Sequence, residues 1–440
     1  MRRRTLLAMP ALMLLGAAGC GELLASRYPT DAYMNPIMNS GADPWVIRSG
    51  DMYYLTMTTG NNVTIWASKD LTNIAQGQSA IVWTPSGGFA DIWAPELHHI
   101  GNRWYIYFAA DQRGDNATHR MYVLESMTEN PMGPYLFTGQ ITSADNHWAI
   151  DGTVLTVDSN LYFVWSGWAE TKSGPQNLYI APMSSPTTIS GPRVEISVPT
   201  YEWETSHAAI NEGPEALVHN GNVFIIYSAN ASWTNAYCLG QLTLHGTNPL
   251  QASQWMKSSE PVFQSSSVVF GPGHASYTLS PEDDQHWIVY HAAQYKGAGW
   301  TRNVRTQPFS FTRTGDPAFG TPDPITALGH APSGEPTYRQ LAQGQSTAQA
   351  YHFSIRIHRA GTYRLWVHYS NAGPTTSATL TVKGTPITEI PFSKTTTTGS
   401  YFFTVAAAVF TEGLTMATID LQNLPLANID AVWVSVDPIA

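Results

Sequence analysis

The sequence predicts an all-β protein, a five-bladed β-propeller followed by a small β-sandwich. Two observations support this fold class. One hairpin pattern occurs five times between residues 35 and 325, and a run of short alternating strands follows from residue 338. Only 12% of the residues are charged, whereas average soluble domains have about 25%. Aromatic residues also make up 12% of the chain, a composition that suits a β protein in contact with neutral sugars.

The repeated hairpin combines a turn with a strand whose second residue is aromatic and whose fourth is aliphatic. In the fourth repeat the turn contains Asn220-Gly221, a strong hairpin signal because both residues tolerate positive φ. The strands begin 51 to 63 residues apart, a period that suits one four-stranded sheet per repeat. An array of unrelated hairpins in a sandwich is the alternative. The aromatic residues are Tyr53, Trp104, Tyr162, Phe224 and Trp287, and the aliphatic ones are Leu55, Ile106, Val164, Ile226 and Val289.

The amino terminus has the pattern of an export signal. Three arginines at 2–4 precede an apolar run from Leu6 to Leu15, and small residues lead to Cys20. We interpret residues 1–20 as a signal peptide of the lipoprotein type, with plain secretion after cleavage near Ala18 as the alternative. Residues 21–34 then form a tether, and the protein is secreted or held at the cell surface. Cys238 is the only other cysteine, so no disulfide framework is expected.

Charge and hydropathy argue against binding to nucleic acid and against a transmembrane helix. The net charge is −10 and no basic stripe occurs, so nucleic acid is not expected to bind. No apolar run reaches the roughly 18 residues of a transmembrane helix. Contact with a membrane is therefore expected only through a lipid on Cys20. We also expect a monomer.

A polar residue stands shortly before the aligned strand in every repeat. In a propeller the first strands of all blades run the same way, so these residues should meet at one mouth of the central channel. Each alone would be an ordinary loop residue, but like charges gathered in one place repel and lose solvation, which indicates a functional site. The five residues are Asp43, Glu96, Asp151, Glu212 and His274, and Glu215 is a supporting residue.

Several motifs around these positions resemble those of glycoside hydrolase family 43. The resemblance implies an inverting five-bladed propeller enzyme that acts on arabinose- or xylose-containing polymers. It assigns Asp43 as general base, Glu212 as general acid, and Asp151 as the residue that orients the acid and tunes its pKa. The motifs are Ala42-Asp-Pro, Trp93-Ala-Pro-Glu-Leu, Ile150-Asp-Gly-Thr, Glu212-Gly-Pro-Glu, Gly271-Pro-Gly-His and Arg302-Asn-Val-Arg-Thr-Gln-Pro-Phe.

The resemblance also implies residues that bind substrate and a metal ion. Arg302 corresponds to the family arginine that contacts substrate, and Arg305 takes its place if the register differs. His274 corresponds to a residue near a central metal ion, with calcium as the candidate, contacted through water. The expected substrate-binding residues are Trp93, Glu96, Trp168, Glu215 and Arg302. Aromatic side chains that could form an apolar wall are Trp45, Phe89, Trp93, Trp148 and Trp168; packing within the blades is the alternative for at least half of them.

The chemistry of inversion explains why two carboxyl groups are needed. One must be protonated to assist the leaving oxygen, and one must be ionised to activate water across the ring, about 6.5–9.5 Å away. Their pKa values must therefore differ. The charge of Asp151, one blade from Glu212, is expected to raise the pKa of the acid.

The expected substrate is a plant cell-wall polysaccharide or oligosaccharide. The stretches that begin at Trp93, Trp165 and Tyr179 resemble members that remove terminal α-L-arabinofuranose, including exo-acting enzymes on 1,5-linked arabinan. A β-xylosidase is the alternative within the family. A non-catalytic sugar-binding propeller is the alternative of another class, and the presence of both base and acid favours the enzyme.

The carboxyl-terminal quarter predicts a separate domain. Turn-rich residues 326–337 form a linker, and residues 338–440 alternate as strands of a β-sandwich. The segments that begin at Ala360 and Ile429 resemble carbohydrate-binding modules of families 6 and 35. Tyr401 and Phe402 fall near the stacking aromatic of such modules. The usual Glu-Ala-Glu opening is absent, so a purely structural appendage stays an open alternative.

Overall fold

The computed structural model describes residues 31–397 and 399–439. The predicted signal peptide, its Cys20 and most of the predicted tether lie outside this range. The regular structure of the described residues consists almost entirely of strands, with few and short helices, which confirms the all-β prediction. Among them, no helix is long and apolar enough to span a membrane.

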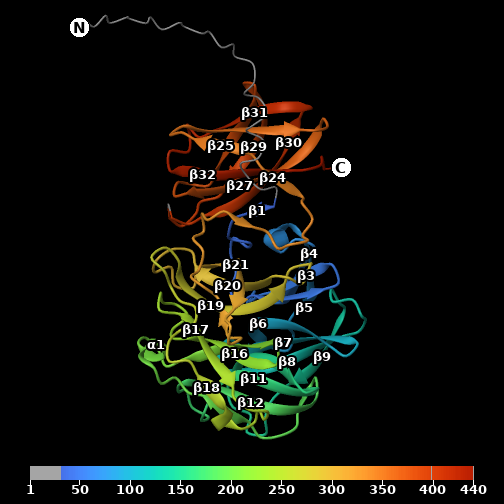
Figure 1. Ribbon diagram of the computed structural model, residues 1–440, viewed down its shortest axis with the longest axis vertical. Coiled ribbons are helices and arrows are strands. Elements are labelled where there is room, and N and C mark those ends of the chain that lie inside the picture. Colours follow the sequence, from blue (N-terminus) through green and yellow to red (C-terminus); the bar gives the residue numbers. More distant parts are fainter. Residues whose placement is uncertain (1–30, 398, 440) are drawn as a thin grey trace, which may run out of the picture.

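Five antiparallel sheets follow one another along the chain, each with its strands in sequence order (Figure 1). The first sheet contains β2 (Trp45–Ser49), β3 (Met52–Thr56), β4 (Val63–Ser68) and β5 (Gln78–Trp83), with the 3-10 helix η1 (Leu71–Gln76) between the last two. The second contains β6 (Phe89–Ile100), β7 (Arg103–Gln112), β8 (Asp115–Ser126) and β9 (Tyr135–Gln140). The third contains β10 (Ala149–Val157), β11 (Asn160–Trp168), β12 (Gln176–Ser185) and β13 (Thr188–Ile189), and β14 (Val194–Ser197) also pairs with β12.

The fourth and fifth sheets complete the series. The fourth contains β15 (Asn211–His219), β16 (Asn222–Ala229), β17 (Cys238–Leu244) and β18 (Trp255–Lys257). The short helix α1 (Glu202–Thr205) precedes this sheet, and the 3-10 helix η2 (Ala252–Gln254) lies between its last two strands. The last sheet contains β19 (Phe270–Leu279), β20 (His286–Ala293), β21 (Arg302–Phe311) and β22 (Pro317–Ala318). The five aligned sequence repeats thus lie on β3, β7, β11, β16 and β20, the second strand of each sheet.

The first strands of the five sheets pack against one another in a cycle. β2 contacts β6, β6 contacts β10, β10 contacts β15, β15 contacts β19, and β19 contacts β2 again. The hydroxyl of Ser276 on β19 fixes the last contact, since it accepts from the Val46 N–H (3.0 Å) and donates to the Pro44 carbonyl (2.9 Å). The cycle brings the start of every first strand to one region of the molecule.

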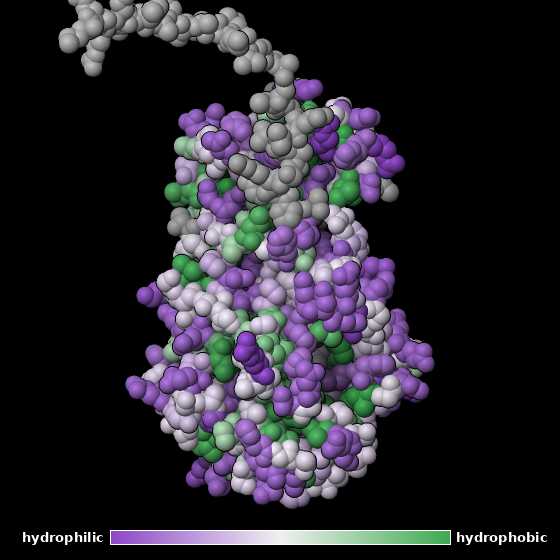
Figure 2. All heavy atoms as spheres, viewed as in Figure 1, coloured by the Kyte–Doolittle hydropathy of each residue, from purple (hydrophilic) through white to green (hydrophobic). Residues whose placement is uncertain are grey.

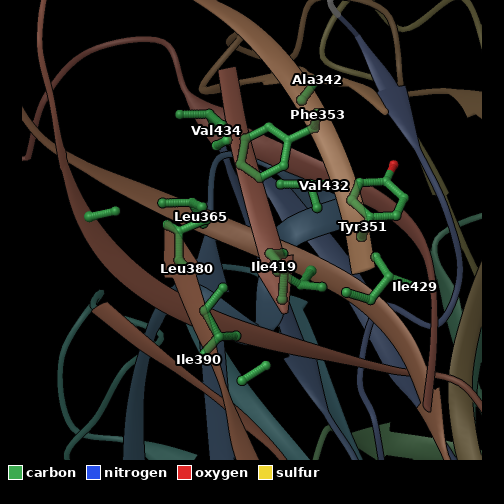
Figure 3. Close-up of a cluster of buried hydrophobic side chains, with 14 of the residues drawn as sticks. Ala342, Tyr351, Phe353, Leu365, Leu380, Ile390, Ile419, Ile429, Val432 and Val434 are labelled. Atoms are coloured by element: carbon green, nitrogen blue, oxygen red, sulfur yellow. The ribbon is translucent and has the colours of Figure 1, made fainter. Parts of the chain in front are cut away.

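Two further antiparallel sheets form the carboxyl-terminal part and share one core. One contains β24 (Arg339–Leu341), β32 (Ala427–Ser435), β27 (Gly361–Asn371) and β30 (Phe402–Phe410). The other contains β25 (Gln343–Ser346), β26 (Ala350–Ile357), β31 (Gly413–Asp420), β28 (Thr376–Val382) and β29 (Thr385–Phe392). Figure 3 shows Phe353, Leu365, Ile390 and Val432 within this core, drawn from both sheets. Two short strands, β1 (Ala32–Tyr33) and β23 (Gly329–His330), pair with each other near the carboxyl-terminal sheets.

The outer face of the β24–β32–β27–β30 sheet packs against the start of the described chain. Met34 joins Trp366, Ala431 and Trp433 in one buried apolar cluster, and the indole N–H of Trp433 donates to the Ala32 carbonyl (3.1 Å). This contact attaches the carboxyl-terminal sheets to the segment that leads into the first of the five sheets. On the molecular face in Figure 2, hydrophobic residues are scattered among hydrophilic ones.

The two aromatic residues expected to stack on sugar in this part pack against protein groups. Tyr401 stacks on His368, with ring centroids 5.0 Å apart, and Phe402 packs partly against the shared core. Sugar binding by this region stays a prediction.

Candidate active site

A cavity of about 870 Å³ opens where the first strands of the five sheets begin. Its charged lining includes five residues expected at the site: Asp43, Asp151, Glu212, His274 and Arg302. Its aromatic lining consists of Trp93, Trp148, Trp168, Trp233 and Trp300. The volume lies within the range of about 300–1,000 Å³ that is typical of small-molecule sites.

The backbone takes the same unusual conformation at the equivalent place in each of the five sheets. A left-handed conformation, with φ between 42° and 55°, occurs at Asp43, Ala94, Asp151, Gly213 and His274. For residues other than glycine it costs about 1–3 kcal/mol and is found preferentially at functional sites. It turns the Asp43, Asp151 and His274 side chains into the cavity. At Gly213 a side chain would be strained by the positive φ, and its Cβ would lie 3.0 Å from the ring of His274, which would have to shift by a few tenths of an ångström.

This conformation corrects the repeat alignment at two positions. In the fourth sheet Gly213, and not Glu212, is equivalent to Asp151, although Glu212 still lines the cavity. Glu96 was expected at the cavity mouth, but Ala94 occupies the equivalent position and Glu96 follows two residues later. Glu215 stands in the same relation to Gly213, so Glu96 and Glu215 are equivalent to each other. The Trp-Ala-Pro-Glu motif contains no feature that reveals at which residue the backbone turns.

Glu96 and Glu215 are buried beneath the cavity and do not line it. Glu96 lies 2.8 Å from Nε2 of His98 and is also hydrogen-bonded to Glu215. Burial and the neighbouring charge of Glu96 raise the pKa of Glu215 well above its ordinary value, which favours its protonated form. Their expected role in substrate binding remains a prediction. Substrate could contact Glu96 or Glu215 only if the cavity extended deeper than it does in this structure.

Asp43 is held as a carboxylate. Burial alone would raise its pKa, but the cationic side chains of His274 and Arg302 outweigh burial and hold the pKa well below its ordinary value. His274 Nδ1 and Arg302 Nη1 lie 3.2 and 3.6 Å from Oδ1, and the Thr58 hydroxyl donates to Oδ2 (2.6 Å). The backbone N–H of Asp43 also donates to His291 (3.0 Å). This environment suits a group that must accept a proton from water.

Glu212 is held in the opposite protonation state. Burial, followed by the charge of Asp151, raises the pKa of Glu212 to about 8, although a hydrogen bond from the Tyr237 hydroxyl to Oε1 (2.8 Å) opposes the shift. Burial also raises the pKa of Asp151 to about 6, with His274 opposing, and its Oδ2 accepts from the Gly213 N–H (3.0 Å). At neutral pH Glu212 is protonated and Asp151 ionised.

His274 is cationic, which does not suit direct ligation of a calcium ion; the expected contact through water stays a prediction. Burial would lower the pKa of His274, but Asp43 and then Asp151 raise it to about 9, so the ring carries a proton and cannot donate a lone pair to a metal. Calcium also prefers oxygen ligands. Within residues 31–397 and 399–439, no group of three or more His, Cys, Asp or Glu side chains is arranged to hold a metal ion. We derive no step through calcium.

The two candidate arginines have different environments. Arg302 lines the cavity, whereas Arg305 is 2% exposed and donates to Asn303 (2.8 Å) and to the Ala293 carbonyl (3.3 Å). The position of Arg302 matches the register that the sequence favoured.

The aromatic residues divide into a cavity wall and sheet packing. Trp168 stacks on Trp148 with centroids 4.6 Å apart and planes 6° apart, and Trp93 stacks on His119 at 4.0 Å. Trp45 and Phe89 do not line the cavity; they pack against the hydrophobic cluster between the first two sheets.

Sequence reasoning missed Thr58, Tyr237, His291, Trp233 and Trp300. None of them occupies the repeated position before a first strand, so the repeat alignment carried no signal for them. The two tryptophans could have been noticed as large aromatic residues within the polar loop 230–237 and the glycine-containing loop 294–301.

An ionised and a protonated carboxyl group in one sugar-sized cavity are what a glycoside hydrolase requires. A family model described as glycosyl hydrolases family 43 matches residues 33–317. The chain therefore belongs to this family, as its motifs predicted.

Characterised relatives agree with this membership. An extracellular exo-α-(1→5)-L-arabinofuranosidase of Streptomyces avermitilis is 36% identical over 330 residues, which cover 71% of this chain and 68% of the relative. A protein of the same name from Streptomyces chartreusis is 35% identical over 301 residues, covering 65% and 92%. The crystal structure of an α-L-arabinofuranosidase from Lactobacillus brevis matches with a TM-score of 0.62 and 34% identity, covering 67% of this chain and 98% of that one.

Proposed function

We propose that this enzyme is an inverting glycoside hydrolase that releases terminal α-L-arabinofuranose from arabinan or from arabinoxylan side chains. The observation that carries the proposal is the pair of carboxyl groups in one cavity, Asp43 held ionised and Glu212 held protonated. The choice of arabinose is supported by the names of the two Streptomyces relatives and of the Lactobacillus structure. The Streptomyces names also favour exo action on 1,5-linked chains.

The catalytic roles follow from the two protonation states. Glu212 donates its proton to the glycosidic oxygen as the bond to C1 breaks, and Asp43 takes a proton from the water that attacks C1 from the opposite face. Asp151 keeps the proton on Glu212 through its negative charge and holds the backbone of Gly213. Arg302 and His274 stabilise the carboxylate of Asp43.

We infer that the five sheets are the blades of a five-bladed propeller, because their first strands pack in a closed cycle. The two carboxyl-terminal sheets, which share one core, support a β-sandwich over about residues 338–440. Secretion is supported by the word "extracellular" in the names of the Streptomyces relatives.

The test is to incubate the purified enzyme with linear arabinan, arabinoxylan and xylo-oligosaccharides and to identify the sugars released over time. Arabinose released one unit at a time is the expected result. Xylose would identify a β-xylosidase instead, and arabino-oligosaccharides as first products would identify endo action. If no sugar is released from any substrate, the result supports a non-catalytic sugar-binding propeller. Glu212→Gln should lose release from the polysaccharide, which links the activity to this cavity.

A further inference from the structure

Two tryptophans at the cavity are far more exposed than the rest of its aromatic lining. Trp233 is 46% exposed and Trp300 is 65% exposed, whereas Trp148 and Trp168 are 4% and 6% exposed. Tryptophan is large and apolar, and its exposure beside a cavity is a common mark of a binding surface. These two rings take no part in the acid–base chemistry described above.

The two rings form a corner that is fixed by hydrogen bonds between their loops. Their centroids lie 5.6 Å apart and their planes are inclined by 73°, so one ring presents an edge to the other. The indole N–H of Trp300 donates to the hydroxyl of Ser232 (3.1 Å), and the Gly297 N–H donates to Asn235 (2.9 Å). The corner is therefore assembled before substrate arrives, which lowers the entropic cost of binding.

The position of the corner relates it to the leaving group. Trp233 follows β16 in the same sheet that carries Glu212 on β15, and Trp300 lies two residues before Arg302 at the start of β21. Glu212 is buried and the side chain of Asp43 is only 14% exposed, whereas the two indoles are exposed to solvent. A terminal sugar must enter to reach the carboxyl groups, and the chain it is cut from must extend outward past the exposed rings.

We propose that Trp233 and Trp300 form a subsite for the neutral sugar on the leaving-group side of the scissile bond, the residue of the arabinan chain next to the released arabinose. The apolar face of a furanose ring stacks on one indole and its edge meets the other. The inference rests on the proposed function. If the two tryptophans stack on the leaving group, they favour hydrolysis of arabinan chains over short arabinosides, because only a substrate with a sugar in the leaving group gains from the stacking.

The test compares one substrate with a large leaving group and one with a minimal leaving group. The full-length enzyme and its Trp233→Ala and Trp300→Ala variants are assayed on 1,5-α-L-arabinotriose and on methyl α-L-arabinofuranoside. Each variant should lose about tenfold in kcat/KM on arabinotriose, equivalent to about 1.4 kcal/mol, and less than twofold on the methyl arabinoside. Trp300→Phe, which keeps a ring, should recover most of the loss.

Met256, which is 59% exposed on β18 and outside the cavity, provides the matched control. Met256→Ala should leave both substrates unchanged. Equal losses on the two substrates in the tryptophan variants would overturn the inference, since the pair would then act on the released sugar or on the fold. Unchanged kinetics on both substrates would overturn it as well. If the wild-type enzyme releases no arabinose from either, the proposed function fails first and the inference with it.

Discussion

The side chain of Asn39 and the backbone of Phe403 exchange two hydrogen bonds, each of 2.8 Å, across 364 residues of sequence. The carbonyl of Asn39 also accepts from the amide of Gln294 (3.1 Å), which donates in addition to the carbonyl of Arg302 (3.2 Å). The carboxyl-terminal sheet is thereby connected to the segment that leads to Asp43 and to the strand that carries Arg302. The carboxyl-terminal sheet therefore helps to hold the segments of Asp43 and Arg302 in place.

We expect Asn39→Ala to destabilise the enzyme. The substitution leaves the N–H and carbonyl of Phe403 without their partner, which typically costs about 1–3 kcal/mol. Thermal or denaturant unfolding measures the loss. Asn428, which is exposed on β32 of the same sheet, serves as the control, and Asn428→Ala should change the stability by no more than about 0.5 kcal/mol. Equal stability of the two variants would show that the contact is not held in solution.

The sequence located most of the candidate site because the repeat carries a physical signal. Alternation of aromatic and aliphatic residues reports burial, so it located the second strand of each sheet. Asp43, Asp151 and His274 were found because they stand at one place in that repeat. The prediction for Glu96 was wrong because the backbone takes the left-handed conformation at Ala94, and the Trp-Ala-Pro-Glu motif does not indicate this.

The remaining features depend on contacts between distant segments. The pairing of Asn39 with Phe403 and the bond from Tyr237 to Glu212 join loops whose separation in sequence gives no periodic signal. The pKa of Asp43 is likewise lowered by His274 and Arg302 on the fifth sheet, and the pKa of Glu212 is raised by burial and by Asp151 on the third. Sequence reasoning supplied the roles of these residues only through the family resemblance.

We expect the alkaline limb of kcat/KM on arabinan to fall near pH 8. Glu212 acts in its protonated form, and burial and Asp151 raise its pKa to about 8, so activity declines as pH rises through that value. Asp43 stays ionised well below its ordinary pKa and does not limit activity at neutral pH. Initial rates between pH 4 and about pH 10 test this. An alkaline limb near the ordinary pKa of a glutamic acid would contradict the proposed acid.

Two substitutions should move this limb in opposite directions. Asp151→Asn removes a negative charge that raises the pKa of Glu212, so the alkaline limb should move to lower pH. Tyr237→Phe removes a hydrogen bond that lowers the same pKa, so the limb should move to higher pH. The pH dependence of kcat/KM for both variants measures the shifts. A change in rate without a shift would mean that the two residues act only on the shape of the site.

Hydrolysis should invert the anomeric centre. Asp43 is proposed to activate water and not to attack the sugar, which requires room for that water between the carboxyl group and C1. Proton NMR of the first product, recorded before mutarotation, distinguishes the anomers. Retention of configuration would make Asp43 a nucleophile.

The roles of acid and base can be separated by the leaving group. Proton donation by Glu212 matters most for a poor leaving group such as another sugar, whereas activation of water by Asp43 is needed whatever departs. Such groups typically contribute about 10²–10⁴-fold to the rate. Glu212→Ala should therefore nearly abolish hydrolysis of arabinan but spare much of the activity on an activated aryl arabinoside. Asp43→Ala should reduce both activities by a similar factor.

Kinetics of both variants on both substrates complete this test, with circular dichroism to verify folding. Because Asp43 and Glu212 lie in one cavity, each variant is the control for the other. The assignment is reversed if the aryl substrate restores activity to Asp43→Ala while Glu212→Ala stays inactive on it. If neither variant distinguishes the two substrates, proton donation to the leaving oxygen must come from another group in the cavity, and Asp151, with its pKa raised to about 6, would be the next residue to replace.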